Sequence, residues 1–415
     1  PKSRLHPEMT TLSNGLRLIV EPESASHVVH VFGHVRGRAE VQVPTGKEGA
    51  DSLLEHLLGF GTESMDRMAF QRALDDIGAD ASAGRDFSLT VLDDHLDRGL
   101  SLLADNELHP RLPARVFRVL RSQQARAVAG QLRSPDFHLR QQLLSAIYPK
   151  DDPMLRHATP DSVSGLTRKD LVDYYHKVYR PDLTTIVVVG DVSPDRVRKL
   201  VEKDFGDWRA KGPKPETQLP GVPLNRAHTV AVPDSSRSQD RVVLAETLGI
   251  NRTDPGYYAL NLGNQVLSGG FYTSRLYRIL RAERGLVYSV SSGIDAHPTR
   301  SILEVSYGSD PDDVDEAHRV IARELKRMGN SPITAEELHQ ARAQLVRQVP
   351  LSESSVSDIG HGLIHRSAEG LPLDEPVQAA KRYLELTPED VRQAYHRWVR
   401  PDDLVQVSEG PAPGQ

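Results

Sequence analysis

The pattern of apolar and polar positions divides the chain into short strands and amphipathic helices. Runs rich in β-branched and other apolar residues predict strands at 16–20, 28–35, 87–92 and 184–189. Apolar residues at helical spacing predict helices at 50–58, 68–77 and 113–131. Strands and helices mixed in this irregular order, with a hairpin signal at Asn14-Gly15, favour an α+β domain with helices packed on a mainly antiparallel sheet.

One stretch of sequence occurs twice, 220 residues apart. The Leu-Thr, Asp, Tyr-His, Arg-Pro-Asp and Gly of residues 166–190 recur without a gap at residues 386–410. Each copy opens with a capping box, formed by a Thr and by an Asp three residues later, and each predicted helix ends before Arg-Pro. A repeat of this length indicates a duplicated domain.

A second pair of helices and a linker support the duplication. Helical patterns open at Leu112-Pro113 and at Ile333-Thr334, and the second has its own capping box. Residues 211–226 contain four prolines and little apolar content, which indicates a semi-rigid linker. We therefore predict two homologous domains, each a mainly antiparallel sheet with helices packed on it, at residues 8–210 and 227–410, joined by a Pro-rich linker at 211–226.

Composition narrows the class of protein. Among 415 residues, 51 basic and 57 acidic side chains give a net charge of −6, which disfavours a nucleic-acid binder. No apolar run approaches the ~18 residues that a membrane span needs. The absence of cysteine excludes a disulfide scaffold, a zinc ribbon and a cysteine nucleophile. The chain begins with Pro1 and has no signal-like segment, so we expect that any targeting peptide has been removed.

The predicted helix at 50–58 carries the first candidate site. Its apolar positions follow the i, i+3, i+4, i+7 stripe of a helix that packs on a core. The opposite face carries Ser52, Glu55 and His56, and we expect these three side chains to point to one place. The alternative interpretation is a solvated helix face.

Several segments together resemble the pitrilysin/insulinase family of zinc metallopeptidases, which includes the mitochondrial processing peptidase and bacterial two-domain members. The likeness lies in Leu12–Val20, Arg36–Glu40, Gly49–Thr62, Leu102–Asp105 and the repeated Leu-Thr…Arg-Pro-Asp segments. It covers nearly the whole chain and implies two homologous domains in a clamshell arrangement. It also implies a His-x-x-Glu-His motif on the helix at 50–58, with two zinc ligands and a general base, and a further ligand Glu on the next long helix.

The sequence departs from this family pattern at two of the three ligands. Ser52 stands where the first histidine is expected, and residues 108–201 contain no glutamate, so the later ligand is missing from residues 124–130. Catalytic zinc normally has three protein ligands, and only His56 remains, although Asp51 or Asp136 could substitute. We expect Ser52, Glu55 and His56 to be the remnant of a degenerate metal motif, with no metal bound by this chain.

The second half keeps its part of the family pattern. Gly269 to Val290 resembles the motif in which an arginine, and a tyrosine seven residues later, bind the substrate carbonyl; the matching residues are Arg281 and Tyr288. Gly285 predicts the helix end, which puts Arg281 in the last turn and Tyr288 on the next strand. A guanidinium and a phenol can stabilise an oxyanion. Alternatively, Arg281 complements the helix dipole and Tyr288 packs in the core.

A broken metal motif and an intact carbonyl-binding motif suggest a division of labour. Some family members are heterodimers in which one subunit carries zinc, so the resemblance implies that this chain is the non-zinc-binding subunit of a heterodimeric zinc metallopeptidase, inactive alone. A homologous zinc-bearing subunit would supply the zinc, and the pair would hydrolyse short or unfolded peptides. The alternatives are a non-catalytic scaffold or peptide-binding protein on the same fold, or a self-sufficient peptidase with altered ligands.

Three further expectations concern location and other polar residues. The motifs and the missing start methionine favour a periplasmic or secreted location, with the cytoplasm as the alternative. His27, His30 and His34 fall in a predicted strand without a carboxylate at metal spacing, so we expect no metal there. The arginine-rich region 111–140 is expected to be a solvated helix face.

Overall fold

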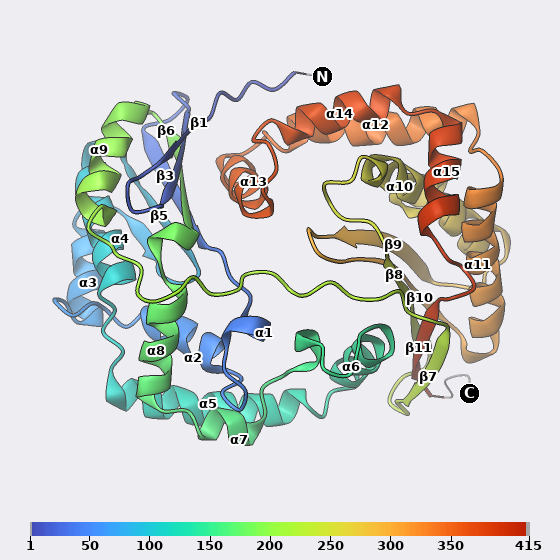
Figure 1. Ribbon diagram of the computed structural model, residues 1–415, viewed down its shortest axis with the longest axis horizontal. Coiled ribbons are helices and arrows are strands. Elements are labelled where there is room, and N and C mark those ends of the chain that lie inside the picture. The colour runs from blue at the N-terminus through green and yellow to red at the C-terminus, as the bar shows by residue number, and fades with distance from the viewer. Residues whose placement is uncertain (1, 412–415) are drawn as a thin grey trace.

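The computed structural model describes residues 2–411 and consists of two halves, each built on one sheet (Figure 1). The first sheet has the strand order β1-β2-β6-β3-β5-β4, in which β2 and β6 run parallel and the other neighbours antiparallel. Its strands are β1 (Glu8–Thr11), β2 (Arg17–Pro22), β3 (Val28–Val35), β4 (Asp80–Ser82), β5 (Asp86–Leu92) and β6 (Thr184–Gly190).

The second sheet repeats the topology of the first. Its order is β7-β11-β8-β10-β9, which matches β2-β6-β3-β5-β4 strand for strand, and its parallel pair is β7 with β11. The predicted fold class, α+β with two homologous mainly antiparallel halves, is therefore confirmed. The strands are β7 (His228–Pro233), β8 (Asp240–Leu248), β9 (Ser289–Ala296), β10 (Ser301–Ser309) and β11 (Val405–Gly410).

The helices of the two halves also correspond. The predicted capping boxes form at Thr167, Thr334 and Thr387, where each threonine accepts from the backbone N–H three residues later. The helices of the first half are α1 (Ala39–Gln42), α2 (Ala50–Leu58), α3 (Arg67–Asp75), α4 (Leu96–Leu108), α5 (Ala114–Gln131), α6 (Pro135–Ile147), α7 (Pro160–Ser164), α8 (Arg168–Val178) and α9 (Pro194–Phe205). Those of the second are α10 (Gly256–Asn264), α11 (Val314–Asn330), α12 (Ala335–Leu351), α13 (Val356–Glu369), α14 (Glu375–Glu385) and α15 (Pro388–Trp398), with π-helices η4 (Gln265–Gly269) and η6 (Tyr277–Glu283).

Both sheets are apolar on both faces, because successive side chains of a strand point to opposite sides. On β6, Ile186 and Val188 belong to the core of the first half, which includes residues of α2, α4 and α9. Val187 and Val189, on the same strand, face the other way into a separate apolar cluster. Each sheet therefore needs helices on two sides.

The second face of each sheet is covered by a helix from the other half. Helix α6 follows α5 in the first half but packs against β7, β8 and β11 of the second sheet, with Leu139 and Leu143 against Val243 and Val405. Helix α13 is the equivalent helix of the second half, and it packs against β3 and β6 of the first sheet. Figure 1 shows α13 beside the first sheet and α6 beside the second. The two halves thus exchange one helix each.

Gly360 allows α13 to lie close to the first sheet. A Cβ atom at this position would come within 2.3 Å of the Phe32 ring on β3, a contact that a packed interior does not allow. The exchange explains why a cut at residues 211–226 does not separate the structure into two independent cores. The domain limits 8–210 and 227–410 stay a prediction.

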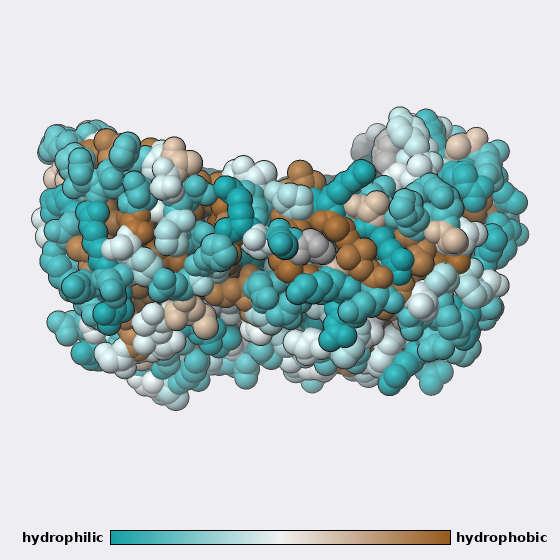
Figure 2. Space-filling view, turned by 90° about the horizontal axis from the view of Figure 1, so that it is seen from above, coloured by the Kyte–Doolittle hydropathy of each residue, from teal (hydrophilic) through white to brown (hydrophobic). Residues whose placement is uncertain are grey.

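The overall shape is that of two lobes with a hollow between them. Figure 2 shows the hollow along one side of the molecule, with apolar residues gathered in the middle. Within residues 2–411, no helix is long and apolar enough to cross a membrane.

Candidate functional site

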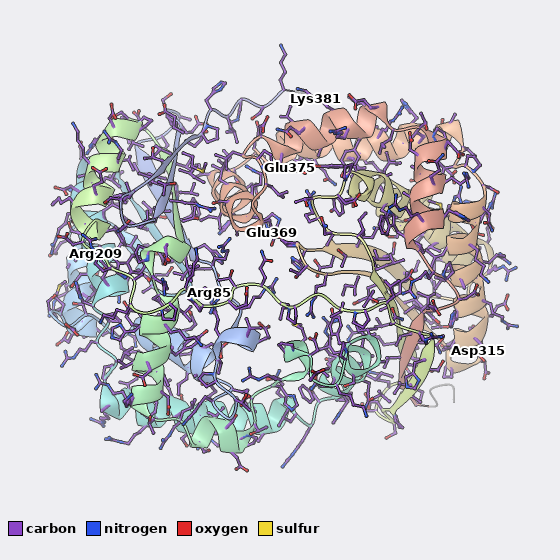
Figure 3. The ribbon with its side chains drawn as sticks, in the orientation of Figure 1. Arg85, Arg209, Asp315, Glu369, Glu375 and Lys381 are labelled. Carbon is purple, nitrogen blue, oxygen red and sulfur yellow. The ribbon has the colours of Figure 1, made fainter. Side chains whose placement is uncertain are left out.

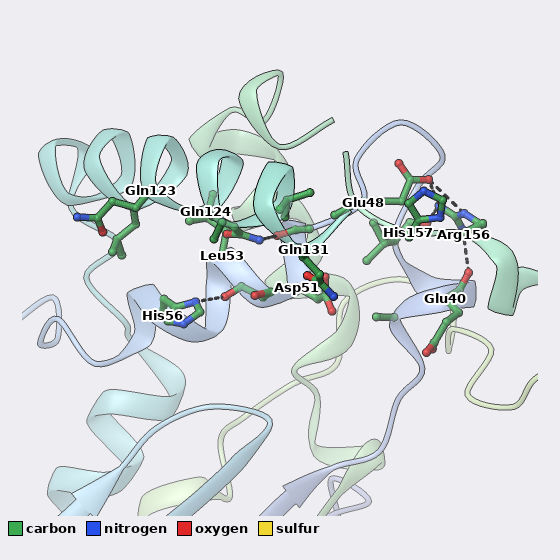
Figure 4. Close-up of a pocket in the computed structure, with 18 residues that line it drawn as sticks. Glu40, Glu48, Asp51, Leu53, His56, Gln123, Gln124, Gln131, Arg156 and His157 are labelled. Atoms are coloured by element: carbon green, nitrogen blue, oxygen red, sulfur yellow. Dashed lines mark hydrogen bonds and ion pairs between the residues drawn. The ribbon is translucent and has the colours of Figure 1, made fainter. Parts of the chain in front are cut away.

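The helix of the degenerate metal motif has the bounds that its apolar stripe predicted. Helix α2 buries Ala50, Leu53, Leu54, Leu57 and Leu58 in the first core. It begins after Gly49, whose φ of 96° lies in the left-handed region that favours glycine. Asp51 and His56 of α2 lie on the side of this helix that is turned toward α5, as Figure 4 shows.

A cavity of about 560 Å³ lies between α2 and α5, and Ser52 and His56 line it. The His56 Nδ1–H donates to the Ser52 backbone oxygen at 2.7 Å, which leaves Nε2 as the free ring nitrogen. Helix α5 contributes Gln123, Gln124 and Gln131 to the wall. The α5 side of the cavity therefore offers amides in place of a carboxylate.

These residues do not fit a catalytic zinc. A neutral serine hydroxyl and glutamine amides are poor zinc ligands. His56, His157, Asp51, Glu40 and Glu48 also line the cavity, but among the described residues no three of them bring ligand atoms close enough to share an ion. Of the groups of three His, Asp or Glu side chains in residues 2–411, the set close enough to share an ion is His27, Asp93 and Asp191, which is remote in sequence from α2 and mostly exposed. His27 thus has carboxylate neighbours that its spacing in the sequence did not reveal.

The expectation that three polar side chains of α2 point to one place is wrong for Glu55. It does not line the cavity with Ser52 and His56. Its carboxylate accepts from the Arg85 backbone N–H at 3.0 and 3.1 Å and from the Tyr179 hydroxyl at 2.5 Å. Glu55 therefore fastens α2 to the β4–β5 turn and to the end of α8.

A second carboxyl group holds the same turn. Glu107 is fully buried on α4 and accepts from the Gly84 backbone N–H at 2.7 Å. Burial raises the pKa of Glu107 well above its ordinary value, because the charged carboxylate loses its contact with water. A Cβ atom at Gly84 would lie 2.3 Å from the Glu55 carboxylate, so this turn requires glycine. The polar residues beneath α2 form a structural network.

In the second half, the structure brings Arg281 and Tyr288 together. Arg281 lies in the π-helix η6, and Gly285, with φ of 70°, ends this helix as predicted. Tyr288 directly precedes β9, and its N–H donates to the Gly308 carbonyl on β10 at 2.8 Å. The Arg281 guanidinium carbon is 5.6 Å from the centroid of the Tyr288 ring. π-helical turns are rare and frequently occur at functional sites.

Both side chains are exposed, which contradicts the alternative in which Tyr288 packs in the core. Tyr288 is 48% exposed, and its hydroxyl donates to Asp310 Oδ2 at 3.0 Å. This hydrogen bond to Asp310 is the largest cause that raises the pKa of Tyr288. Arg281 donates to the Val287 carbonyl oxygen at 3.2 Å. Asp310 is a neighbour that sequence spacing did not identify, because it follows β10 and meets Tyr288 through strand pairing.

Proteins with similar sequences match this chain in both of its halves. A family model described as the peptidase M16 inactive domain matches residues 165–345, a segment that includes Arg281 and Tyr288. An uncharacterized zinc protease of Mycobacterium tuberculosis is 29% identical over 391 residues, which are 89% of this chain and 87% of the relative. A probable inactive metalloprotease of Bacillus subtilis is 26% identical over 271 residues, covering 61% and 60% of the two chains.

Among solved structures, the crystal structure of a peptidase M16 inactive domain from Pseudomonas fluorescens has the same fold. It superposes with a TM-score of 0.85 over 99% of each chain, at 24% sequence identity. The strand order, the two halves and their arrangement are therefore those of a known architecture.

Proposed function

We propose that this chain, which is similar to the M16 peptidases in sequence and fold, is the zinc-free subunit of a heterodimeric zinc metallopeptidase. A homologous partner subunit would hold the zinc, its ligands and the general base. This chain would supply Arg281, Tyr288 and one wall of a chamber that takes short or unfolded peptides.

The asymmetry between the two candidate sites is the observation that carries the proposal. The metal motif lacks its first histidine and its later glutamate, and Glu55 is hydrogen-bonded to the Arg85 backbone and to the Tyr179 hydroxyl. Arg281 and Tyr288 remain exposed and adjacent.

Arg281 and Tyr288 would act on the carbonyl group of the scissile peptide bond. During hydrolysis this oxygen gains negative charge, and donors already aimed at it lower the barrier. The Arg281 guanidinium is a permanent cation. The Tyr288 hydroxyl has one proton, so it must leave Asp310 in order to donate to the substrate oxygen.

Peptides would bind in an extended form, by adding to the exposed edge of a sheet. Main-chain hydrogen bonds to such an edge give affinity with little dependence on sequence. Strand β9 is an edge strand and follows Tyr288 directly, so a peptide on this edge would pass the Arg281–Tyr288 pair. The size of the closed chamber would limit the substrates to short or unfolded chains.

Reconstitution with a zinc-bearing homologue tests the proposal. We expect the isolated chain to hydrolyse nothing, and the mixture to cleave a denatured peptide in a chelator-sensitive reaction. Arg281→Ala and Tyr288→Phe should each lower kcat/KM about 10²–10³-fold, the usual loss for an oxyanion donor. Arg278→Ala is the matched control, because Arg278 lies in the same π-helix and pairs with Glu283. Unchanged kcat/KM in both test variants would contradict the assigned role.

A scaffold or peptide-holding protein on the same fold is the second candidate. It is favoured by the contacts that Arg281 and Tyr288 make with their own chain, since both groups are satisfied without substrate. A mixture that binds peptide but never cleaves it, with any zinc-bearing homologue, would support this alternative. A periplasmic or secreted location remains part of the proposal, and fractionation of cells would test it.

A further inference from the structure

A second cavity, of about 370 Å³, lies where the two halves meet. Its walls come from five parts of the chain: the end of β3 with the residues after it, the start of β5, the linker at 217–219, the β9–β10 turn and helix α13. The linker crosses the middle of the molecule in Figure 1, and Figure 3 shows Glu369 of α13 near it. A ligand in this cavity would contact both halves.

The carboxylates in the wall already have cationic or imidazole partners. Glu369 lies 3.5 Å from His297 Nδ1, and Asp86 lies 2.6 Å from His34 Nδ1. Arg300, which also lines the cavity, forms a buried pair with Asp152 at 3.0 Å. Among the described residues, the other arginines of the wall, Arg36 and Arg38, have no carboxylate within 4.0 Å, and Glu369 acts on both only at longer range.

Arg36 and Arg38 are the arginines without a bonded partner. Neither guanidinium donates a hydrogen bond to another described residue, and both side chains are only partly exposed. Burial, and then the nearby cation of Arg17, lower the pKa of Arg36, while the carboxylates of Asp182, Glu216 and Glu369 act against this shift. A half-buried guanidinium without a close hydrogen-bonded partner is costly, and an anion bound in the cavity would lower this cost.

Apolar residues line the same cavity. Leu219 and Ile364 are buried, and Pro298 and Ala368 lie beside them in the wall. Guanidinium groups bind carboxylates through two parallel hydrogen bonds. Because Asp86 and Glu369 also face the cavity, a singly charged anion is favoured over a phosphate dianion.

We propose that this cavity binds the C-terminal residue of a peptide, with its carboxylate on Arg36 and Arg38 and an apolar side chain against Ile364 and Leu219. The inference rests on the proposed function only in taking peptides as the ligands. It adds a subsite that would select short peptides and cleavage products by their free C-terminus. The residues of this subsite are different from Arg281 and Tyr288.

Isothermal titration of the full-length chain, without any partner subunit, tests this subsite. The probes are an acetylated Ala-Ala-Leu tripeptide with a free C-terminus, the same peptide as its C-terminal amide, and inorganic phosphate. We expect the free acid to bind at least about tenfold more tightly than the amide, because the amide loses the charged hydrogen bonds. Phosphate should bind more weakly than the acid.

Two variants and a control locate the binding. Arg38→Gln, and the double variant with Arg36→Gln, should lower the affinity for the acid at least about tenfold and leave the amide unaffected. Arg118→Gln is the control, since Arg118 is exposed on α5. Equal binding of acid and amide, tighter binding of phosphate, or unchanged affinity in a folded Arg38→Gln chain would overturn the proposal. These results do not depend on peptidase activity, so they separate this inference from the proposed function.

Discussion

Truncating Leu363 tests whether the exchanged helix α13 joins the two halves into one cooperative unit. Leu363 is 0% exposed and packs with Ile359 of its own helix against Ile19, Val187 and Val189 of β2 and β6. Strand β6 lies inside the sheet, with hydrogen-bonded neighbours on both sides, so it cannot move to fill a hole. Buried Leu→Ala substitutions cost about 2.7–5.0 kcal/mol, and a rigid wall puts the cost in the upper part of this range, about 4 kcal/mol.

The two tryptophans allow each half to be followed separately. Trp208 lies in the first half and Trp398 in the second, and the sequence has no other tryptophan. In urea titrations of single-tryptophan chains, Leu363→Ala should lower both midpoints together. Leu351→Ala, at a residue 64% exposed on α12, is the control and should cost less than about 0.5 kcal/mol. A loss below about 1 kcal/mol for Leu363→Ala, or a shift at one tryptophan alone, would refute the reasoning.

Three other predictions concern single polar groups. Glu55→Gln should lower the free energy of unfolding by about 1–3 kcal/mol, because the Arg85 backbone N–H and the Tyr179 hydroxyl no longer donate to a charged group. The kcat/KM of the reconstituted pair should stay unchanged. A large loss of kcat/KM with normal stability would instead indicate that Glu55 acts as a general base. Hydrogen bonds to Asp295 and Glu369 raise the pKa of His297 from 6.5 to about 9, so its stabilising contribution is complete below pH 6.5 and is lost as pH rises through about 9. Urea midpoints of wild type and His297→Gln should converge above that pH, and parallel pH profiles would argue against it. Asp310→Asn should lower the pKa of Tyr288 toward its ordinary value, as followed by NMR titration of the Tyr288 ring, and an unshifted titration would show that Asp310 is not its partner.

The elements and the duplication could be predicted from sequence because their signals are local. The apolar stripe of residues 50–58 and the capping boxes at Thr167 and Thr387 act within a few residues, and the structure keeps their bounds. The repeated segment showed which helix and which strand of the second half correspond to those of the first half. It therefore predicted the second sheet as a copy of the first.

The direction of single polar side chains depends on distant parts of the chain. Ser52 and His56 face the cavity as expected, but Glu55 turns to Arg85 and Tyr179, which lie far along the sequence. Asp310 reaches Tyr288 only through the β9–β10 pairing. The exchange of α6 and α13 between the halves also could not be predicted from the sequence, because the apolar stripe of a helix does not specify which sheet it covers.

The crossed helices α6 and α13 have a mechanical consequence. Each helix is covalently connected to one lobe and packs its apolar face on the other. Moving the lobes apart would therefore expose two buried apolar faces at once. The polypeptide should consequently behave as a stiff half-shell instead of a hinge. Entry of a substrate into the proposed chamber would then depend on how far the two subunits swing apart, and the strength of their mutual contact would set the rate of admission.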